Sequence, residues 1–155
     1  MIVAVKRPAV WKCLMLPDGQ RLIVSSHYEN KERLSVYDEN HNIFRLDAAG
    51  NVLWQIERNE GVVEEGFGGL RRAAERGETD AESGFLSGIE PFMCFILHYP
   101  DGRNNIDPNT GEPPDCAIWE PGVQVRTSSL SGWPYDVDIE RGVARNIATR
   151  PIRPW

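Results

Sequence analysis

IFRLDAAGNVLWQIER, at residues 43–58, gives the clearest secondary-structure signal in this chain. Two apolar runs, 43–47 and 52–58, flank Ala48-Ala49-Gly50-Asn51, a composition suited to a turn. In the second run Val52, Trp54 and Ile56 alternate with Leu53 and Gln55, so one face of the strand is strongly apolar and the other mixed. The stretch therefore predicts a β-hairpin.

Two further hairpins are predicted on its N-terminal side. Residues 9–16 and 21–26 flank Pro17-Asp18-Gly19-Gln20, where proline sets φ for one turn residue and glycine accepts a positive φ. Residues 33–38 are predicted to form a strand that pairs with 43–47 through a turn at 39–42. The first 58 residues thus read as a series of hairpins.

The C-terminal half predicts more strands. Residues 91–98 are a continuous apolar run, typical of a strand buried on both faces. A loop is expected over 100–115, which is rich in Pro, Gly, Asp and Asn. Short strands are predicted at 116–119, 123–129, 133–139 and 143–149.

The middle of the chain differs from both ends. Residues 61–88 are rich in Gly, Glu and Arg, and 68–77 have the composition of a short helix bracketed by glycines. The expected fold is a single mainly β domain over 1–155, an antiparallel meander of hairpins with one short helix in this long insertion. A twisted two-sheet structure and a partly open barrel both fit the pattern.

The charge distribution is uneven. The formal net charge is −6, and residues 57–90 hold nine acidic residues against four arginines. An acidic chain is a poor candidate for nucleic-acid binding, which depends on neutralising phosphates, and an acidic patch suits a basic partner better. The alternative is a solvated face with no partner.

The cysteines and the N-terminus indicate a cytoplasmic location. Cys13, Cys94 and Cys116 are an odd number at wide spacings with no CxxC pair, so we expect all three to be reduced and structural. The N-terminal apolar run is broken by Lys6, Arg7, Pro8 and Lys12, and no later stretch is long and apolar enough for a membrane helix. No membrane association is expected.

No catalytic, metal or cofactor site is predicted. His27, His41 and His98 stand far apart without metal-ligand spacing. Residues 107–112, DPNTGE, have calcium-like acids, but glycine falls at the fifth place and no glutamate closes a twelve-residue loop. Glu64 and Glu65 are adjacent, so their side chains point in different directions. The chain is therefore not expected to be an enzyme.

The aromatic residues supply a second set of candidates. Most of the five tryptophans are expected in the core. Trp133 and Trp155 lie beside prolines in less apolar surroundings, and these two are predicted to be exposed.

Parts of the chain resemble known proteins. The 43–57 segment is similar to one hairpin of a pyrroloquinoline-quinone-type β-propeller blade, in which an LD…G…LW pattern recurs, and 135–146 is a weaker copy. A propeller needs several such repeats, so this likeness implies local geometry and no cofactor.

A broader likeness is to small uncharacterised bacterial proteins, some of which act as immunity proteins that neutralise a toxin. The shared pieces are Leu16 to Gly19, Asn42 to Asp47, Gly50 to Ile56, Pro91-Phe92, and Ser131-Gly132-Trp133 followed by Tyr135, Asp136, Asp138 and Gly142. The resemblance implies a β-rich fold and a protein partner.

Charge placement and this resemblance lead to one functional prediction. The chain is expected to be a non-enzymatic protein-binding module, of the toxin-immunity type, that meets a basic protein through an acidic surface. Its candidate residues are Glu64, Glu65, Glu75, Glu78, Asp80 and Glu82. Two alternatives stay open: a small-molecule binder or enzyme with a pocket between the hairpins and the long loops, and a dimerising scaffold. The sequence does not predict the oligomeric state.

Overall fold

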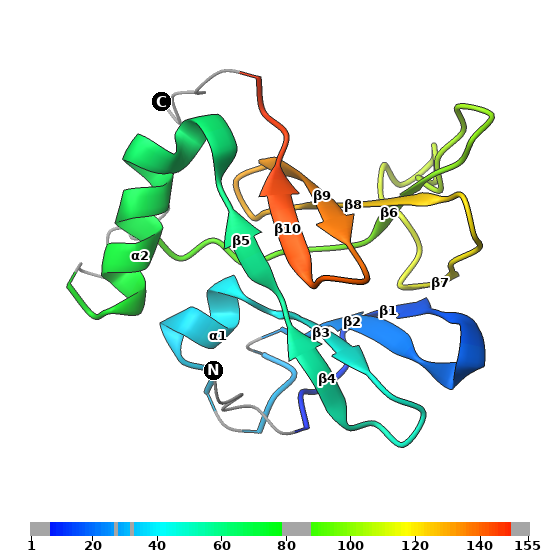
Figure 1. Cartoon of the computed structure of the whole chain (residues 1–155), viewed down its shortest axis with the longest axis horizontal. Helices are drawn as coiled ribbons and strands as arrows, with labels where there is room; N and C mark the ends of the chain where they lie inside the picture. Colours follow the sequence, from blue (N-terminus) through cyan, green and yellow to red (C-terminus); the bar gives the residue numbers. More distant parts are fainter. Residues whose placement is uncertain (1–6, 27, 32, 79–87, 150–155) are drawn as a thin grey trace.

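The computed structural model describes residues 7–26, 28–31, 33–78 and 88–149. Its ten strands form two five-stranded sheets (Figure 1). The first sheet has the order β4-β3-β2-β1-β7 and the second the order β5-β10-β9-β8-β6. The fold is therefore mainly β, as predicted, in its two-sheet form.

The first sheet is a meander extended by one distant strand. β1 (Lys12–Met15), β2 (Arg21–Val24), β3 (Ile43–Leu46) and β4 (Val52–Gln55) pair antiparallel in chain order. β7 (Cys116–Ile118) adds to β1 in parallel. The predicted hairpins at 9–26 and 43–58 are confirmed over these strands, while the parallel strand is a feature that the meander prediction lacked.

The second sheet has the same plan. β6 (Ile96–His98), β8 (Gln124–Ser128), β9 (Pro134–Asp138) and β10 (Val143–Asn146) pair antiparallel, and β5 (Glu57–Asn59) adds to β10 in parallel. The strands predicted in the C-terminal half are present with shorter ends. The predicted strand 91–98 is regular only in β6, because Phe92 forms an isolated bridge with Ser129 before the chain joins the sheet.

One extended segment belongs to both sheets. The amide of Ile56 donates to the carbonyl of Ile43 in the first sheet at 2.9 Å, and the next amide, of Glu57, donates to Gly142 in the second at 2.8 Å. β4 and β5 are therefore two halves of one strand that changes partners at the buried Ile56 (Figure 1).

The main hydrophobic core lies between the two sheets. It takes Leu14, Leu22, Val24 and Ile43 from the first sheet and Val125, Tyr135, Val137 and Ala144 from the second. Phe92 packs edge-on against Tyr135, with ring centroids 5.0 Å apart. Aromatic pairs of this geometry stabilise a core beyond the apolar area that they bury.

The predicted strand at 33–38 is wrong. Residues Val36–Asn40 form helix α1, which Ser35 caps by accepting a hydrogen bond from the amide of Asp38 at 3.1 Å. A serine followed three residues later by an acid is a helix-start signal, and here it outweighs the alternating apolar pattern. The strand that pairs with β3 on this side is β2.

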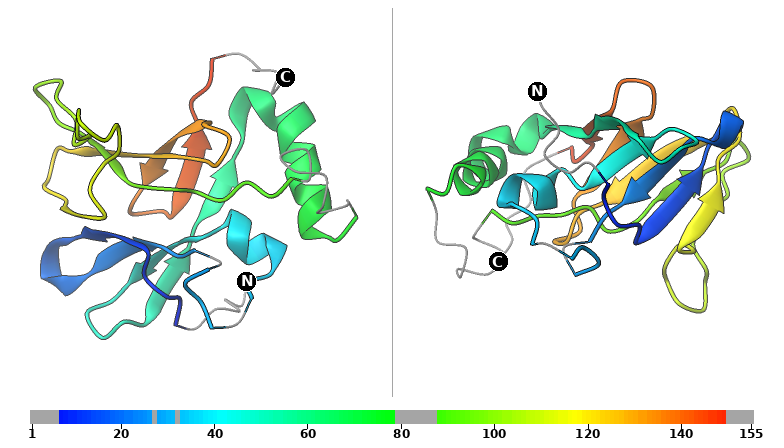
Figure 2. Two further views of the ribbon diagram at one scale, coloured as in Figure 1. Left: turned by 180° about the vertical axis from the view of Figure 1, so that it is seen from behind. Right: turned by 90° about the horizontal axis from the view of Figure 1, so that it is seen from below.

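The predicted helix in the middle segment is present and longer than expected. A 3₁₀ turn η2 (Gly61–Val63), a π-helical turn η3 (Glu64–Gly68) and α2 (Gly69–Glu75) follow one another. α1 and α2 lie side by side at one end of the molecule, and the loop over 99–115 lies at the other (Figure 2). Within the described ranges, no helix combines the length and apolar composition needed to cross a membrane.

Candidate functional site

Two of the described acids of the middle segment are paired with arginines. Glu64 pairs with Arg72, and Glu78 pairs with Arg76 at 2.8 Å, all on the outside of the molecule. Glu65 is exposed. Asp80 and Glu82 lie outside the described residues. The exposed acids near the helix are thus partly neutralised by arginines of the same segment.

Glu75 corrects the predicted acidic surface. Its side chain is only 8% exposed, and its carboxylate accepts a hydrogen bond from Arg71 at 2.6 Å and lies 2.9 Å from Nε2 of His41. The face of α2 that carries Arg71 and Glu75 packs toward α1, so the side chain of Glu75 points into the protein. A partner that approaches the surface does not meet this carboxylate.

Glu75 belongs to a larger buried polar cluster, which consists of His41, Arg58, Glu60, Arg71, Glu75 and Tyr135. At its centre Glu60, fully buried, accepts hydrogen bonds from Nε of Arg58 at 3.1 Å and Nε of Arg71 at 2.7 Å. Tyr135 donates its hydroxyl hydrogen to Glu60 at 2.5 Å and accepts from Arg58 at 2.6 Å. The polar cluster joins α2 to β5 and β9 of the second sheet.

His41 connects this cluster to the first sheet. Its Nδ1 lies 2.9 Å from the carbonyl oxygen of Ile56, which only accepts, so Nδ1 is the donor. Burial alone would raise the pKa of Glu75, but the hydrogen bonds and positive charges of His41 and Arg71 outweigh it and hold that pKa below its ordinary value. The polar cluster is therefore a set of paired charges inside the protein, with a structural role.

Trp133 is also buried, contrary to the prediction. Its side chain is 8% exposed and packs against Phe67, with ring centroids 5.9 Å apart. Trp133 follows Gly132, which takes a positive φ of 91° in the turn between β8 and β9, and its indole is part of the main core. Trp155 lies outside the described residues.

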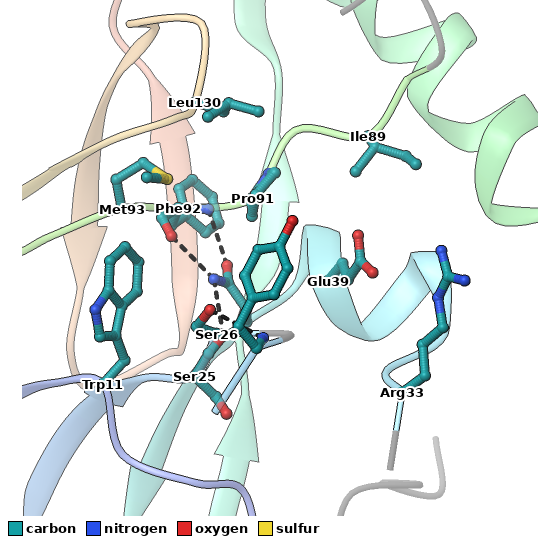
Figure 3. Close-up of a pocket in the computed structure, with 12 residues that line it drawn as sticks. Trp11, Ser25, Ser26, Arg33, Glu39, Ile89, Pro91, Phe92, Met93 and Leu130 are labelled. Atoms are coloured by element: carbon teal, nitrogen blue, oxygen red, sulfur yellow. Dashed lines mark hydrogen bonds between the residues drawn. The ribbon is translucent and has the colours of Figure 1, made fainter. Parts of the chain in front are cut away.

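A groove of about 520 Å³ is a candidate binding site on the described surface. It lies between the 25–42 segment and the 89–93 segment, with Trp11 and Leu130 adding to its walls. Figure 3 shows Trp11 and Met93 toward one end, and Arg33 and Glu39 toward the other. We call this the aromatic groove; its lining residues are Trp11, Ser25, Ser26, Tyr28, Arg33, Glu39, Asn42, Ile89, Pro91, Phe92, Met93 and Leu130.

Asn42 fixes the floor of the aromatic groove. Its buried side-chain amide donates to the carbonyl oxygens of Ser25 at 3.1 Å and Phe92 at 2.9 Å, and its Oδ1 accepts from the amide of Phe92 at 2.9 Å (Figure 3). One side chain therefore holds the two walls together through their backbones. Such satisfied buried amides give a rigid local geometry.

Glu90 fixes the opposite rim. Its buried carboxylate accepts hydrogen bonds from the amide of Ser131 at 3.1 Å and from its hydroxyl at 2.6 Å. The amide of Leu130 donates to the carbonyl of Pro91 at 2.9 Å. These bonds hold the β8–β9 turn against the 89–93 segment, so Leu130 is presented at the edge of the aromatic groove.

The side chains that line the aromatic groove are suited to binding a ligand. Among its described lining residues, the groups that are charged at neutral pH are Arg33 and Glu39, and none is histidine, cysteine or lysine. The hydroxyls of Ser25 and Ser26 accept hydrogen bonds from Asn30 and the amide of Tyr28. The lining that the structure describes therefore provides apolar contact area and two charges.

A second, shallower hollow of about 480 Å³ lies on the outer face of the second sheet. There Asp136 pairs with Arg126 at 2.9 Å and Arg145 at 3.5 Å across neighbouring strands. Burial and the charge of Arg126 lower the pKa of the nearby His98. These charges satisfy one another, as is usual on the solvated face of a sheet.

No metal site is evident in the part of the chain that is described. Its histidine, cysteine, aspartate and glutamate side chains form no group of three close enough to hold an ion. In the 107–112 turn the carboxylate of Asp107 accepts a hydrogen bond from the amide of Asn109 at 2.8 Å. Asp107 is therefore a turn-forming residue.

Comparison of the chain with models of protein families, with curated proteins and with solved structures found no match. The assignment of the candidate site therefore rests on the geometry of this protein alone. Sequence reasoning missed the aromatic groove because its walls come from four separated segments, although Pro91-Phe92 and Trp11 were visible as apolar signals.

Proposed function

We propose that this chain is a non-enzymatic protein-binding module and that the aromatic groove is its recognition site. The observation that carries the proposal is the exposure of large apolar side chains around a fixed floor. Tyr28 is 91% exposed and Leu130 is 55% exposed, and both line the groove beside Trp11, Phe92 and Met93. Aromatic residues, Met and Arg are enriched at protein interfaces.

The proposed partner inserts one aromatic or branched aliphatic side chain into the aromatic groove. Apolar contact with Trp11, Met93 and Leu130 supplies most of the affinity, as anchoring residues do in other interfaces. Arg33 and Glu39 make the other end of the groove polar, so the partner is expected to place its apolar anchor at the end formed by Trp11 and Met93 (Figure 3).

The acidic residues have a secondary role in this proposal. Glu57, Glu64, Glu65 and Glu78 are at the surface, and the whole chain carries a net charge of −6. Their field speeds the encounter with a basic partner, while the aromatic groove sets how long the complex lasts. The finer proposal, that the partner is a bacterial toxin and the chain its immunity protein, rests on the sequence resemblance alone.

A photo-crosslinking experiment tests the site. A photoreactive amino acid replaces Leu130 in the groove, Glu65 on η3, or Asn109 in the distal loop, and each variant is irradiated in its native lysate. We expect a discrete protein adduct from the Leu130 variant and none from Asn109. An adduct formed only at Glu65 would move the site to the acidic segment.

The captured protein is then purified and titrated against purified wild type, Tyr28→Ala and Leu130→Ala. Both side chains are largely exposed, so these changes leave the fold intact. We expect each variant to weaken the Kd by about tenfold to a hundredfold. Equal affinities for wild type and both variants would reject the aromatic groove as the recognition site.

The size of the groove favours a small apolar molecule as a second candidate ligand. About 520 Å³ lies within the range of small-molecule sites. Native mass spectrometry of the protein isolated from its source distinguishes the two ideas. A bound small molecule that the Leu130→Asp variant loses, together with no crosslinked protein, would favour this candidate.

A further inference from the structure

Two cysteines that lie 103 positions apart in sequence are neighbours in the first sheet. Cys13 of β1 and Cys116 of β7 occupy partner positions in the parallel register, followed by Leu14 opposite Ala117. Leu14 and Ala117 face the main core. Because side chains alternate along a strand, both cysteines project from the opposite face of the sheet.

The spacing of these strands is compatible with a disulfide. Neighbouring strands lie about 4.8 Å apart, and Cα atoms of disulfide-bonded cysteines are usually about 4.4 to 6.8 Å apart. Cys13 and Cys116 have free thiols in this structure; Cys13 is buried and Cys116 is exposed. The pair therefore has one thiol open to solvent and one held behind it.

The surroundings of Cys13 suit it to the second step of such a reaction. Burial and the adjacent Cys116 raise the pKa of Cys13, while the guanidinium of Arg21 beside it acts in the opposite direction. Because the thiolate is the reactive form of a cysteine, the exposed Cys116 is the better first nucleophile. The parallel register then places Cys13 on the neighbouring strand as its partner.

We propose that Cys13 and Cys116 are a reversible disulfide pair, closed by a small-molecule disulfide such as oxidised glutathione. The thiolate of the exposed Cys116 attacks the glutathione disulfide, and one glutathione thiolate leaves. The deprotonated Cys13 then attacks the sulfur of Cys116 in the mixed disulfide, and the second glutathione thiolate leaves. Two protein thiols are oxidised, and one glutathione disulfide is reduced to two thiols.

The consequence of closure is a covalent link at the edge of the first sheet. β7 is an edge strand whose sheet partner is β1, and it follows the long loop over 99–115. The bond would tie this loop and strand to the N-terminal strand and remove conformational freedom from the unfolded chain. Oxidised protein should therefore unfold at a higher temperature than reduced protein.

The test uses the full chain in glutathione redox buffers, with intact-mass measurement after acid quenching. We expect wild type and the control Cys94→Ser to lose two hydrogens, with the Cys13–Cys116 link found by peptide mapping. Cys116→Ser should lose none. The Tm of oxidised wild type should exceed that of reduced wild type by about 5 to 15 °C, and a dithiol should reverse the shift.

Two results would overturn the proposal. One is a stable single glutathione adduct on Cys116 with Cys13 still reactive toward a thiol reagent after unfolding. The other is an intermolecular disulfide between copies of the chain with no internal link. Cys116→Ser changes an exposed residue, so its folding is checked by circular dichroism before its chemistry is compared with that of wild type.

Discussion

In the polar cluster, charged side chains are enclosed between α2 and the two sheets, whereas in the aromatic groove large apolar side chains face solvent. Glu60 and Arg71 are buried, and Tyr28 and Leu130 are exposed. The usual distribution of residue types is thus reversed in both regions. The comparison teaches that the buried charges of the polar cluster serve the fold and that the exposed apolar residues are the stronger functional candidates.

The largest expected effect comes from removing the central charge of the polar cluster. Glu60→Gln keeps the shape of the side chain but leaves Arg58 and Arg71 short of a negative charge inside the protein. Loss of one partner from a buried pair costs about 3 to 5 kcal/mol. Urea denaturation should show this fall in the free energy of unfolding; a fall no larger than that of the exposed Glu65→Gln would contradict a structural role for the cluster.

A smaller effect is expected when one hydroxyl is removed from the same cluster. Tyr135→Phe retains the ring against Phe92 but removes the group that donates to Glu60 and accepts from Arg58. Because both partners stay buried, we expect a loss of about 1 to 3 kcal/mol in denaturant unfolding. The Tyr99→Phe variant, at a half-buried tyrosine whose ring contacts Arg103, is the comparison. Equal losses of stability in the two variants would show that the hydroxyl of Tyr135 contributes no more than that of a tyrosine outside the cluster.

The polar cluster should also make stability depend on acid. The pKa of Glu75 is below its ordinary value of 4.5, so the folded state favours its ionised form. The stabilisation is complete above the unfolded pKa and is lost as the pH falls through the folded pKa. Urea midpoints measured from pH 6 downward should therefore fall more steeply for wild type than for Glu75→Gln, and parallel curves would refute this linkage.

The smallest effects on stability are expected in the aromatic groove. Tyr28→Ala and Leu130→Ala change side chains that project into solvent, so each should alter the free energy of unfolding by less than about 0.5 kcal/mol. Their effect on partner binding is expected to be large. Thermal unfolding beside the binding titration separates the two, and a destabilisation as large as that of Glu60→Gln would mean that the groove side chains belong to the core.

The local features of the fold were predictable from the sequence, and the contacts between distant segments were not. Turn chemistry and alternation located the hairpins at 9–26, 43–58 and 133–149, and the Leu, Arg, Ala and Glu content of 68–77 located the helix. The strand at 33–38 was wrong because Ser35 acts as a helix cap. Its cap signal was present in the sequence and competed with the apolar pattern.

The candidate site was even less predictable from the sequence, because it depends on contacts between distant segments. Glu75 was counted with the surface acids because its partner His41 is recognised only when α2 packs beside α1, although Arg71 lies one helical turn away in the sequence. Trp133 was expected outside because it lies beside a proline in less apolar surroundings, whereas its contact with Phe67 joins segments that are far apart in the sequence. The groove depends on Asn42, whose bonds to Ser25 and Phe92 span 17 and 50 positions of the chain.

The strand shared by the two sheets has a consequence for how the protein opens. Since Ile56 and Glu57 place consecutive amides in different sheets, neither sheet can shift its register or detach without pulling on the other. The two layers therefore lack the freedom to slide or fray as separate cooperative units. Backbone amides of β3 and β10, one from each layer, should exchange their hydrogens with solvent through the same global unfolding event.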